Sequence, residues 1–306
     1  MHKISVVIPT YNRANLIGET LAAIFAQTLP AIEVIVVDDG STDDLHAVLA
    51  AYDDRIRVIT IDNSGELVAR NIGLRASIGE LVAFCDSDDL WQPDFLAKMA
   101  AQWTPTPGLV ACYSDFVILS EGVYEPISKF KAAPSSFWKN IRQTTPDGFV
   151  FDAPIEERLL QFQPFFPSCM MVSRDKFLAI GGWDEGTSRL IGCDLATTLR
   201  VAGVAPIGVV QRPLVGIRKH AGNFSGDTER MNLGDAQVLA YVMATRPELG
   251  VHRAAILASI DARRGDALDS AFSRRDFGAV RAIYRLLLPG QKSGIRRIKR
   301  VLAMTR

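Results

Sequence analysis

Acidic side chains follow two apolar segments near the N-terminus, and their spacing points to metal chemistry. Residues 38–39 read Asp-Asp after the segment 33–37, and residues 86–89 read Asp-Ser-Asp-Asp after the segment 81–85. Three carboxylates within four residues repel one another unless they are solvated or bound to a cation. Mg²⁺ and Mn²⁺ prefer oxygen ligands of this kind and bind through one or two carboxylates plus substrate phosphates. The spacing therefore predicts a divalent cation that bridges the protein and an anionic substrate.

Aspartates after a strand can also have a purely structural role, because they often cap a helix or form a turn. We assign that role to Asp43 and Asp44, which open a helical pattern. Neither GxGxxG nor GxxxxGK[ST] occurs in the chain. A nucleotide would therefore be held through metal rather than through a glycine-rich loop.

The elements that must position these carboxylates alternate in type along the first hundred residues. Short apolar runs predict strands, and apolar residues at i, i+4 and i+7 spacing predict helices. Strands are expected at 4–8, 33–37, 57–61 and 81–85, and helices at 16–27, 43–52, 65–77 and 93–103. Such alternation predicts an α/β fold with a parallel sheet and helices on both faces. Ligands bind beyond the carboxyl ends of such strands, which is where the carboxylates lie.

The rest of the chain is less regular, and its pattern suggests two domains. Prolines and aromatic residues accumulate between residues 104 and 167, which we predict as one strand followed by a loop-rich insertion. The strand is expected at 109–117, regular structure returns at 168–172, 194–202 and 207–217, and helices follow from Met231 onward. We divide the chain into a domain of residues 1–225, with halves 1–103 and 104–225, and a helical region of residues 226–306.

Composition narrows the function classes. Lys+Arg and Asp+Glu both number 34 among 306 residues, so net charge gives no reason to expect a nucleic-acid partner. The four cysteines are scattered without a CxxC pair, which favours reduced thiols and a cytoplasmic location. No stretch approaches the roughly 18 apolar residues that a transmembrane helix needs.

Four ordered segments resemble the motifs of glycosyltransferase family 2. They are Ile4–Arg13, Val36–Ser41, Ala69–Gly73 and Phe84–Asp89, and the resemblance extends more loosely to residue 220. It implies a GT-A fold, which is a Rossmann-like mixed sheet flanked by helices, here with a helical C-terminal appendage. It also implies a nucleotide-diphosphate sugar donor, Mn²⁺ or Mg²⁺ as cofactor, and inversion at the anomeric carbon.

The resemblance assigns the first two motifs to the nucleotide. Pro9, Thr10, Tyr11 and Arg13 match the segment that lines it. Asp39 matches the acid that bonds the base, commonly uracil, which favours a UDP-linked donor. For Tyr11, simple packing is the alternative.

The later motifs are assigned to the ribose, the diphosphate and the metal. Arg70 matches a basic residue near the nucleotide, with a surface charge as the alternative. Asp86 matches the acid nearer the ribose, with Ser87 beside it, and Asp88 matches the metal ligand. His220 follows a predicted strand and resembles a late histidine that helps to hold the metal or the diphosphate, although a lone histidine is often structural.

The catalytic base is expected shortly after a Gly-Gly-aromatic-Asp-Glu segment, which is present as Gly181–Glu185. Downstream, Asp194 begins a stretch that ends with an arginine six residues later. The usual Glu-Asp pair reads Cys193-Asp194, and an alanine replaces a second acid two residues on. A carboxylate at Asp194 can take the proton of an acceptor hydroxyl. The alternatives are that Asp194 only caps its helix, or that Glu185 is the base.

Together these roles predict a direct displacement, and the resemblance implies that the acceptor is a hydroxyl of a glycan or a lipid-linked glycan. The aromatic-rich segment 124–166 is expected to shape the acceptor side, because apolar rings stack on sugar faces. Two alternatives stay open at this point. One is a nucleotidyltransferase, which would normally carry a glycine-rich basic loop after its first strand. The other is a non-catalytic module that binds sugars or nucleotides.

The C-terminal segment has the pattern of a basic amphipathic helix. Ile295, Ile298 and Leu302 fall on one helical face, and the cations around them are Arg296, Arg297, Lys299, Arg300 and Arg306. Such a helix can associate weakly with an anionic membrane surface, here the inner face of the membrane. The alternative is a helix packed on the protein with its basic face in water.

Overall fold

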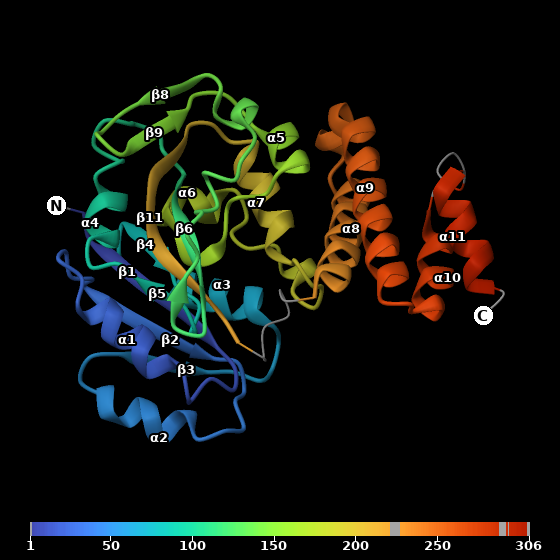
Figure 1. Cartoon of the computed structure of the whole chain (residues 1–306). Coiled ribbons are helices and arrows are strands. Elements are labelled where there is room, and N and C mark those ends of the chain that lie inside the picture. Colours follow the sequence, from blue (N-terminus) through green and yellow to red (C-terminus); the bar gives the residue numbers. More distant parts are fainter. Residues whose placement is uncertain (1, 221–226, 288–291, 293, 305–306) are drawn as a thin grey trace. The chain divides into compact units, whose positions relative to one another are not determined.

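The computed structural model describes residues 2–220, 227–287, 292 and 294–304 (Figure 1). The chain forms two compact units. The first comprises residues 1–188 and 197–220, and the second comprises residues 189–196 and 221–306. Residues 189–196, which include Asp194, thus belong to the helical unit, whereas the sequence pattern grouped them with the first domain.

The first unit is built on one mixed sheet with the order β3-β2-β1-β4-β10-β6-β11-β9-β8. Four strands from the N-terminal half run parallel: β1 (Ile4–Thr10), β2 (Glu33–Asp38), β3 (Arg57–Thr60) and β4 (Leu81–Phe84). The strand β10 (Met170–Ser173) is antiparallel to both β4 and β6 (Ala111–Ser120), and β6 runs parallel to β11 (Ile207–Lys219). The expected mixed α/β sheet is confirmed.

Four short strands complete the sheet: β9 and β8 follow β11 in the strand order, β5 also pairs with β11, and β7 pairs with β6. They are β5 (Leu90–Trp91), β7 (Val123–Tyr124), β8 (Ile141–Gln143) and β9 (Gly148–Phe151). The pair β8–β9 joins the sheet through β11, so residues 104–167 are less loop-rich than expected. Runs of two to four residues are too short to show an alternating pattern in the sequence.

Helices cover both faces of this sheet. They are α1 (Ile17–Phe25), α2 (Leu45–Leu49), α3 (Glu66–Ala76), α4 (Phe95–Ala100), α5 (Glu156–Gln161) and α6 (Arg174–Ala179). Helix α7 (Asp194–Ala202) begins in the second unit and continues in the first from Thr197. One core cluster joins α1, α2 and α4 to the side chains of Ile4, Val6 and Ile8. On the opposite face, Gly73 of α3 lies against Val7, and Phe177 of α6 contacts Phe84. Alternate residues of β1 therefore face different helical layers, as the period of a strand requires.

The first strand extends through Pro9, where the sequence pattern had ended it. Backbone carbonyls of Ile4 and Thr10 accept hydrogen bonds from the β2 side, and those of Lys3 and Val7 accept from the β4 side. Pro9 faces the β4 side as well, but β4 stops pairing opposite Val7. The missing N–H of Pro9 therefore interrupts no ladder, so the strand tolerates the proline.

The second unit is helical, which confirms the expected C-terminal appendage. Its described helices after α7 are α8 (Thr228–Thr245), α9 (Arg253–Ser273), α10 (Phe277–Leu286) and α11 (Gly294–Met304). Buried side chains of α9, α10 and α11, among them Leu268, Ile283 and Ala303, form its core. Within the described residues, no helix has both the length and the apolar character needed to cross a membrane.

Replacement of Gly73 tests the packing of α3 on the sheet. A Cβ at Gly73 would lie 2.3 Å from Val7 Cγ1 and 3.2 Å from Val37 Cγ2. We expect Gly73→Ala to lower the free energy of unfolding by about 1–3 kcal/mol through overpacking, as measured by urea denaturation. The control Gly18→Ala on α1 has its nearest neighbour, Tyr52 Oη, at 3.7 Å, and should gain up to about 1 kcal/mol. Equal stabilities of the two variants would contradict the packing described.

Candidate functional site

The carboxyl ends of β1, β2 and β4 meet at one edge of the sheet, because these strands are parallel neighbours. Arg13 follows β1, Asp39 follows β2, and residues 86–89 follow β4. The predicted nucleotide-binding and metal-binding residues of the N-terminal half therefore lie along the same edge.

Asp88 has two basic neighbours from distant parts of the chain. Its Oδ2 accepts a hydrogen bond from Arg13 Nε at 3.3 Å and lies 2.9 Å from His220 Nε2. His220 directly follows β11, whereas Arg13 follows β1. The Asp88 side chain is 13% exposed, so the carboxylate is within reach of a ligand but largely shielded from solvent. Two other residues singled out from the sequence thus converge on one oxygen atom of Asp88.

Asp86 is paired with Arg70 of α3. Arg70 Nη2 donates to Asp86 Oδ1 at 2.5 Å and to Glu66 Oε2 at 3.3 Å. Arg70 is almost completely buried, so it is not a surface charge. Loss of water around Asp86 raises the pKa of its carboxyl, and the Arg70 guanidinium acts in the opposite direction. In this arrangement Arg70 orients the acid that the resemblance places near the ribose.

Asp89 has a structural role, because its carboxylate is bound by groups of the protein itself. Ser168 Oγ donates to its Oδ2 at 2.5 Å, and the Arg218 backbone N–H donates to its Oδ1 at 3.0 Å. Burial, with the nearby charges of Asp88 and Asp86, raises the pKa of Asp89 well above its usual range. Because Arg218 precedes His220 by two residues, this contact ties the end of β11 to the acidic segment.

Ser168 links two parts of the acidic segment, and sequence reasoning did not single it out. The backbone N–H of Asp86 donates to Ser168 Oγ at 2.9 Å, and the same hydroxyl donates to Asp89. The Ser168 carbonyl also accepts a hydrogen bond from Trp91 Nε1 at 2.8 Å. A serine between a proline and a cysteine carries no sequence signal, because its role depends on pairing between remote strands.

Asp39 closes the loop that precedes α3. Its two carboxylate oxygens accept the backbone N–H groups of Ser64 at 2.7 Å and Gly65 at 2.8 Å. Gly65 has a φ of 97°, a conformation that favours glycine. Each oxygen keeps a further acceptor site, so this geometry is compatible with a bond to a nucleotide base. The neighbouring Asp38 is buried, and its Oδ2 lies 3.0 Å from His46 Nε2.

The predicted nucleotide-lining segment joins the loop after β2. Thr10 is buried, and Tyr11 is 45% exposed, which suits a contact surface better than a packed ring. Asn12 has a φ of 53° and accepts a hydrogen bond from the backbone N–H of Thr42 at 2.7 Å. Its own backbone N–H donates to Ser41 Oγ at 2.9 Å. Asn12 was not singled out, although asparagine tolerates this left-handed conformation better than most residues.

Two other residues that were predicted to bind the nucleotide have structural roles in the backbone. Pro9 lies within β1, and the buried Ser87 presents its carbonyl to Thr20 Oγ1 at 3.1 Å. Asp43, which we interpreted as a capping residue, accepts hydrogen bonds from the backbone N–H groups of Leu45 at 3.3 Å and Ala14 at 2.9 Å. Asp44 occupies the N-cap position of α2 without a side-chain capping bond.

The Gly-Gly-Trp-Asp-Glu segment is held against α3. Asn71 Nδ2 donates to the Trp183 carbonyl at 2.9 Å and to Glu185 Oε1 at 2.8 Å, and Asn71 Oδ1 accepts the Trp183 N–H at 2.9 Å. The Arg70 guanidinium lies 5.1 Å from the centre of the Trp183 ring. Consecutive residues of α3 thus hold both Asp86 and this segment.

Helix α7 is fixed to the same segment at its C-terminal part. Arg200 Nη2 donates to Asp184 Oδ2 at 2.9 Å, and Arg200 Nη1 donates to the Gly182 carbonyl at 3.0 Å. Thr197 Oγ1 accepts the backbone N–H of Asp184 at 2.9 Å. Asp194 is the first residue of this helix. Arg200 therefore anchors the C-terminal part of α7, which belongs to the first unit, whereas Asp194 belongs to the second.

The acidic edge offers few ligands for a metal. In the part of the chain that the structure describes, no group of three or more His, Cys, Asp and Glu side chains could hold an ion. Asp88 and His220 are close enough to each other to provide two ligands. Mg²⁺ typically takes only one or two carboxylates from a protein and completes its shell with substrate phosphates and water. The donor set thus fits a cation that binds together with a diphosphate.

Most aromatic rings of residues 124–166 face one another in the core. Tyr113 of β6 stacks on Phe165 with ring centres 4.3 Å apart, and Phe137 contacts Phe151 and Phe165. Phe130, Phe137, Phe151 and Phe165 are buried. The expectation that this segment offers these rings to an acceptor sugar is therefore wrong for its buried members. Tyr124, which is 46% exposed, is available for such contact.

Curated relatives match about a third of the chain. An uncharacterised glycosyltransferase of Rickettsia conorii is 44% identical over 94 residues, which are 30% of this chain and 16% of the relative. The validoxylamine A glucosyltransferase of Streptomyces hygroscopicus is 42% identical over 120 residues, which are 36% of this chain and 28% of the relative. The match spans less than a third of the length of either relative.

Solved structures of S. aureus TarS (residues 1–349), in complex with UDP or UDP-GlcNAc, have the same fold. Each superimposes with a TM-score of 0.63 and covers 98% of this chain, with 18% and 17% sequence identity. The chain covers 88% and 89% of those structures. The GT-A fold is thereby confirmed. The model of glycosyl transferase family 2 matches residues 5–177 of the 306, which is more than half of the sequence, so the chain belongs to this family.

Proposed function

We propose that the chain transfers a sugar from a nucleotide diphosphate, most consistently UDP, to a hydroxyl of a glycan or a lipid-linked glycan, with inversion. The convergence of Arg13 and His220 on Asp88 at the carboxyl edge of the sheet carries this proposal. Family membership favours this activity over a nucleotidyltransferase. The TarS structures in complex with UDP and UDP-GlcNAc support the choice of donor.

Asp88 and His220 would hold Mn²⁺ or Mg²⁺ together with the donor diphosphate. The cation would neutralise the charge that develops on the leaving nucleotide. Arg13, whose Nε contacts Asp88, adds a further positive charge at the same place. Arg70 keeps Asp86 in position, and this orientation would leave Asp86 able to accept a hydrogen bond from the ribose. These residues bind and orient the donor, and they do not move a proton.

The nucleoside would lie along residues 10–13 and Asp39. Tyr11 offers an exposed ring, and Asp39 is held rigidly by two backbone N–H groups. A preorganised carboxylate loses little conformational freedom when it binds a donor group of the base. This arrangement supports recognition of a base that presents an N–H, as uracil does.

Asp194 would remove the proton of the acceptor hydroxyl as its oxygen attacks the anomeric carbon. Attack from the face opposite the leaving nucleotide inverts the configuration in a single displacement. Thr197 and Arg200, which follow Asp194 in the same helix, contact Asp184 within the first unit. Cys193, which replaces the more usual glutamate, is buried, so it packs within the protein rather than acting as a second acid.

The first test replaces the proposed metal ligand. Asp88→Ala should abolish sugar transfer and the Mn²⁺-dependent part of UDP affinity, because it removes the carboxylate between Arg13 and His220. Isothermal calorimetry of UDP with and without Mn²⁺ measures this. Asp44→Ala, at an N-cap position without a side-chain bond, is the matched control and should bind as the unchanged protein does. Unaltered Mn²⁺-dependent affinity in Asp88→Ala would exclude the proposed site.

The second test separates chemistry from donor binding. Asp194→Asn should leave donor affinity unchanged and lower kcat roughly a hundredfold or more, as expected when a general base is lost. Turnover is measured as release of UDP from a set of UDP-sugars. Glu185→Gln is the control, because Glu185 accepts a bond from Asn71 and is the other candidate base. Near-normal kcat in Asp194→Asn with a large loss in Glu185→Gln would reassign the base, and no turnover in the unchanged protein would favour a non-catalytic module.

A further inference from the structure

Residues 189–196, which include Asp194, are part of the helical unit. Asp194 is partly exposed, whereas its neighbours Cys193 and Leu195 are buried. The position of the Asp194 carboxylate therefore depends on how this short segment is held within its own unit. Helices α8 and α9 provide contacts on both sides of Asp194.

The backbone before Asp194 packs directly on α8. A Cβ at Gly234 of α8 would lie 2.4 Å from the Ile191 carbonyl oxygen and 2.9 Å from the carbonyl carbon. Glycine is unfavourable in the interior of a helix, so this close approach of two backbones explains its presence there. Gly192 has a φ of 73°, and a Cβ on it would lie 2.2 Å from Asp235 Oδ1. Contact at this point thus requires glycine on both segments.

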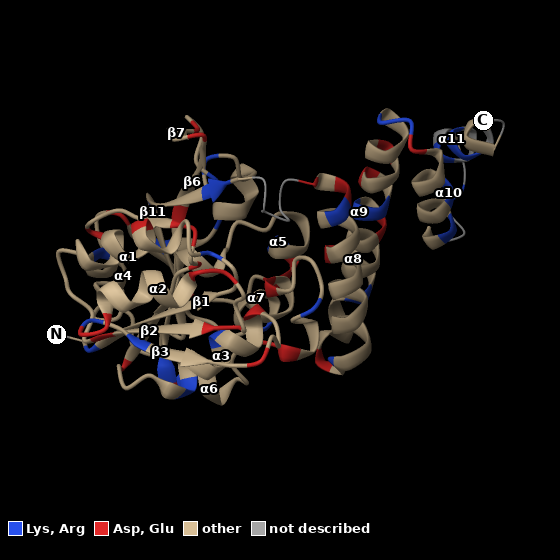
Figure 2. Ribbon diagram, turned by 90° about the horizontal axis from the view of Figure 1, so that it is seen from below, with Lys and Arg blue, Asp and Glu red and all other residues tan. Residues whose placement is uncertain are grey.

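The Asp235 side chain that faces Gly192 is held in turn by α9. Figure 2 shows acidic and basic residues on both α8 and α9, and Asp235 belongs to a pair that joins them. Its Oδ2 lies 3.2 Å from Arg263 Nε, and Arg263 Nη1 donates to Ser259 Oγ one turn earlier. The side chains of Asp235 and Arg263 are 22% and 14% exposed, so solvent and salt screen this pair only weakly.

A further contact follows Asp194 in the chain. Arg246, directly after α8, is buried and donates through Nη1 to the Ala196 carbonyl at 2.7 Å. Ala196 lies in the first turn of α7, which begins at Asp194. Hydrogen bonds from a charged donor are stronger than those between neutral groups. The contacts at Ile191, Gly192 and Ala196 therefore lie on both sides of Asp194.

Another face of α9 holds α11. Arg296 Nη1 lies 3.1 Å from Asp261 Oδ2, and Lys299 Nζ lies 2.7 Å from Asp269 Oδ1. Part of the basic face predicted for the C-terminal helix is thus used within the unit. Contact of this helix with a membrane stays a prediction, because several of its predicted residues lie outside the described part of the structure: the side chains of Ile295, Arg297 and Ile298, and the residue Arg306.

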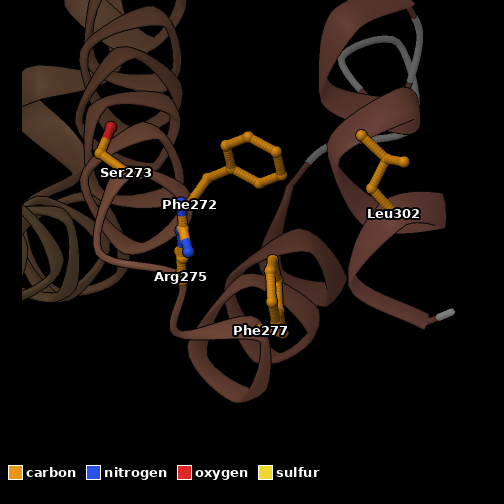
Figure 3. A pocket seen from close by; sticks show the side chains of 5 residues that line it. All are labelled: Phe272, Ser273, Arg275, Phe277 and Leu302. Atoms are coloured by element: carbon orange, nitrogen blue, oxygen red, sulfur yellow. The ribbon is translucent and has the colours of Figure 1, made fainter. Parts of the chain in front are cut away.

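The C-terminal end of α9 makes contacts of its own. Arg274 Nη2 lies 2.5 Å from Glu229 Oε2 in the first turn of α8. A pocket of about 400 Å³ also lies near this end (Figure 3), and it is lined by Phe272, Ser273, Arg275, Phe277 and Leu302. The pair of Arg274 and Glu229 joins the same two helices through residues other than those that hold 191–196, so it provides a matched control.

We propose that α8 and α9 position the predicted general base, because they hold residues 191–196 so that the Asp194 carboxylate keeps one orientation. The inference rests on the proposed function, in which Asp194 takes the proton of the acceptor hydroxyl. Gly234, Asp235 and Arg246 act through that carboxylate and are positioning residues rather than catalytic ones. A displacement of about 1 Å can cost about a hundredfold in rate. Contacts within the helical unit therefore control kcat and leave the affinity for the donor unchanged.

Variants at two of these contacts test the proposal. Gly234→Ala and Arg246→Met should each lower kcat about tenfold or more, because they displace Asp194. Calorimetry should show unchanged affinity for UDP, and Arg246→Lys, which keeps a charged donor, should restore most of the kcat. The controls are Arg274→Met and Gly250→Ala, where a Cβ meets nothing within 4 Å, and both should keep full kcat. Circular dichroism checks that each variant is folded.

A double-mutant cycle shows whether the effect passes through Asp194. In the Asp194→Asn background, Gly234→Ala and Arg246→Met should lower kcat no further, because the group that they position is already inactive. Equal losses in both backgrounds, an equal loss in Arg274→Met, or full kcat in both single variants overturns the inference and leaves the base assignment standing. Near-normal kcat in Asp194→Asn overturns the assignment and the inference together.

Discussion

Repulsion among the carboxylates of residues 86–89 is the constraint around which the first unit is organised. Three negative charges follow a buried strand within four residues, and each is met by partners from a different part of the fold. Arg70 of α3 contacts Asp86, and Arg13 and His220 contact Asp88. Asp89 receives hydrogen bonds from Ser168 and from the backbone of Arg218. Residues 86–89 stay at the sheet edge because they are contacted from α3, from the segment after β1, from the segment before β10 and from the end of β11.

This division of partners also explains how one short segment can have three roles. Asp89 is buried and holds the end of β11, so it is not available to a substrate. Asp86 is oriented by an almost fully buried arginine. Asp88 alone combines a partly accessible carboxylate with a histidine, which is the combination a diphosphate-bound cation can use. The difference lies in the surroundings of each residue, since all three are aspartates.

The sequence predicted the elements whose signals are local. The strands and helices of the first hundred residues, the mixed GT-A sheet and the family follow from apolar periodicity and from motifs of adjacent residues. The contacts of Ser168, Asn71 and Arg218 could not be found this way, although Asn71 lies within the motif Ala69–Gly73, because each acts through a partner 79 to 129 positions away. The pair β8–β9 was missed because its strands are very short. The predicted end of the first strand, before Pro9, was wrong. Which neighbouring strand a backbone N–H faces depends on strand pairing, and the sequence of a single segment does not reveal that pairing.

The C-terminal helix α11 also shows what the sequence alone could not predict. Its basic residues read as one solvent-facing set in the sequence, but Arg296 and Lys299 contact acids of α9. Only the structure separates cations that hold α11 in place from those that are directed outward. Amphipathic pattern thus identified the helix, and tertiary contacts decide which face of it can meet a partner.

The most direct test of the account is the anomalous diffraction of crystals soaked with Mn²⁺ and UDP. We expect a manganese peak coordinated by the Asp88 carboxylate and the diphosphate, with His220 beside it and the base next to Asp39. UDP bound at this edge without manganese, or manganese bound away from Asp88, would contradict the claim that residues 86–89 form a metal-assisted donor site.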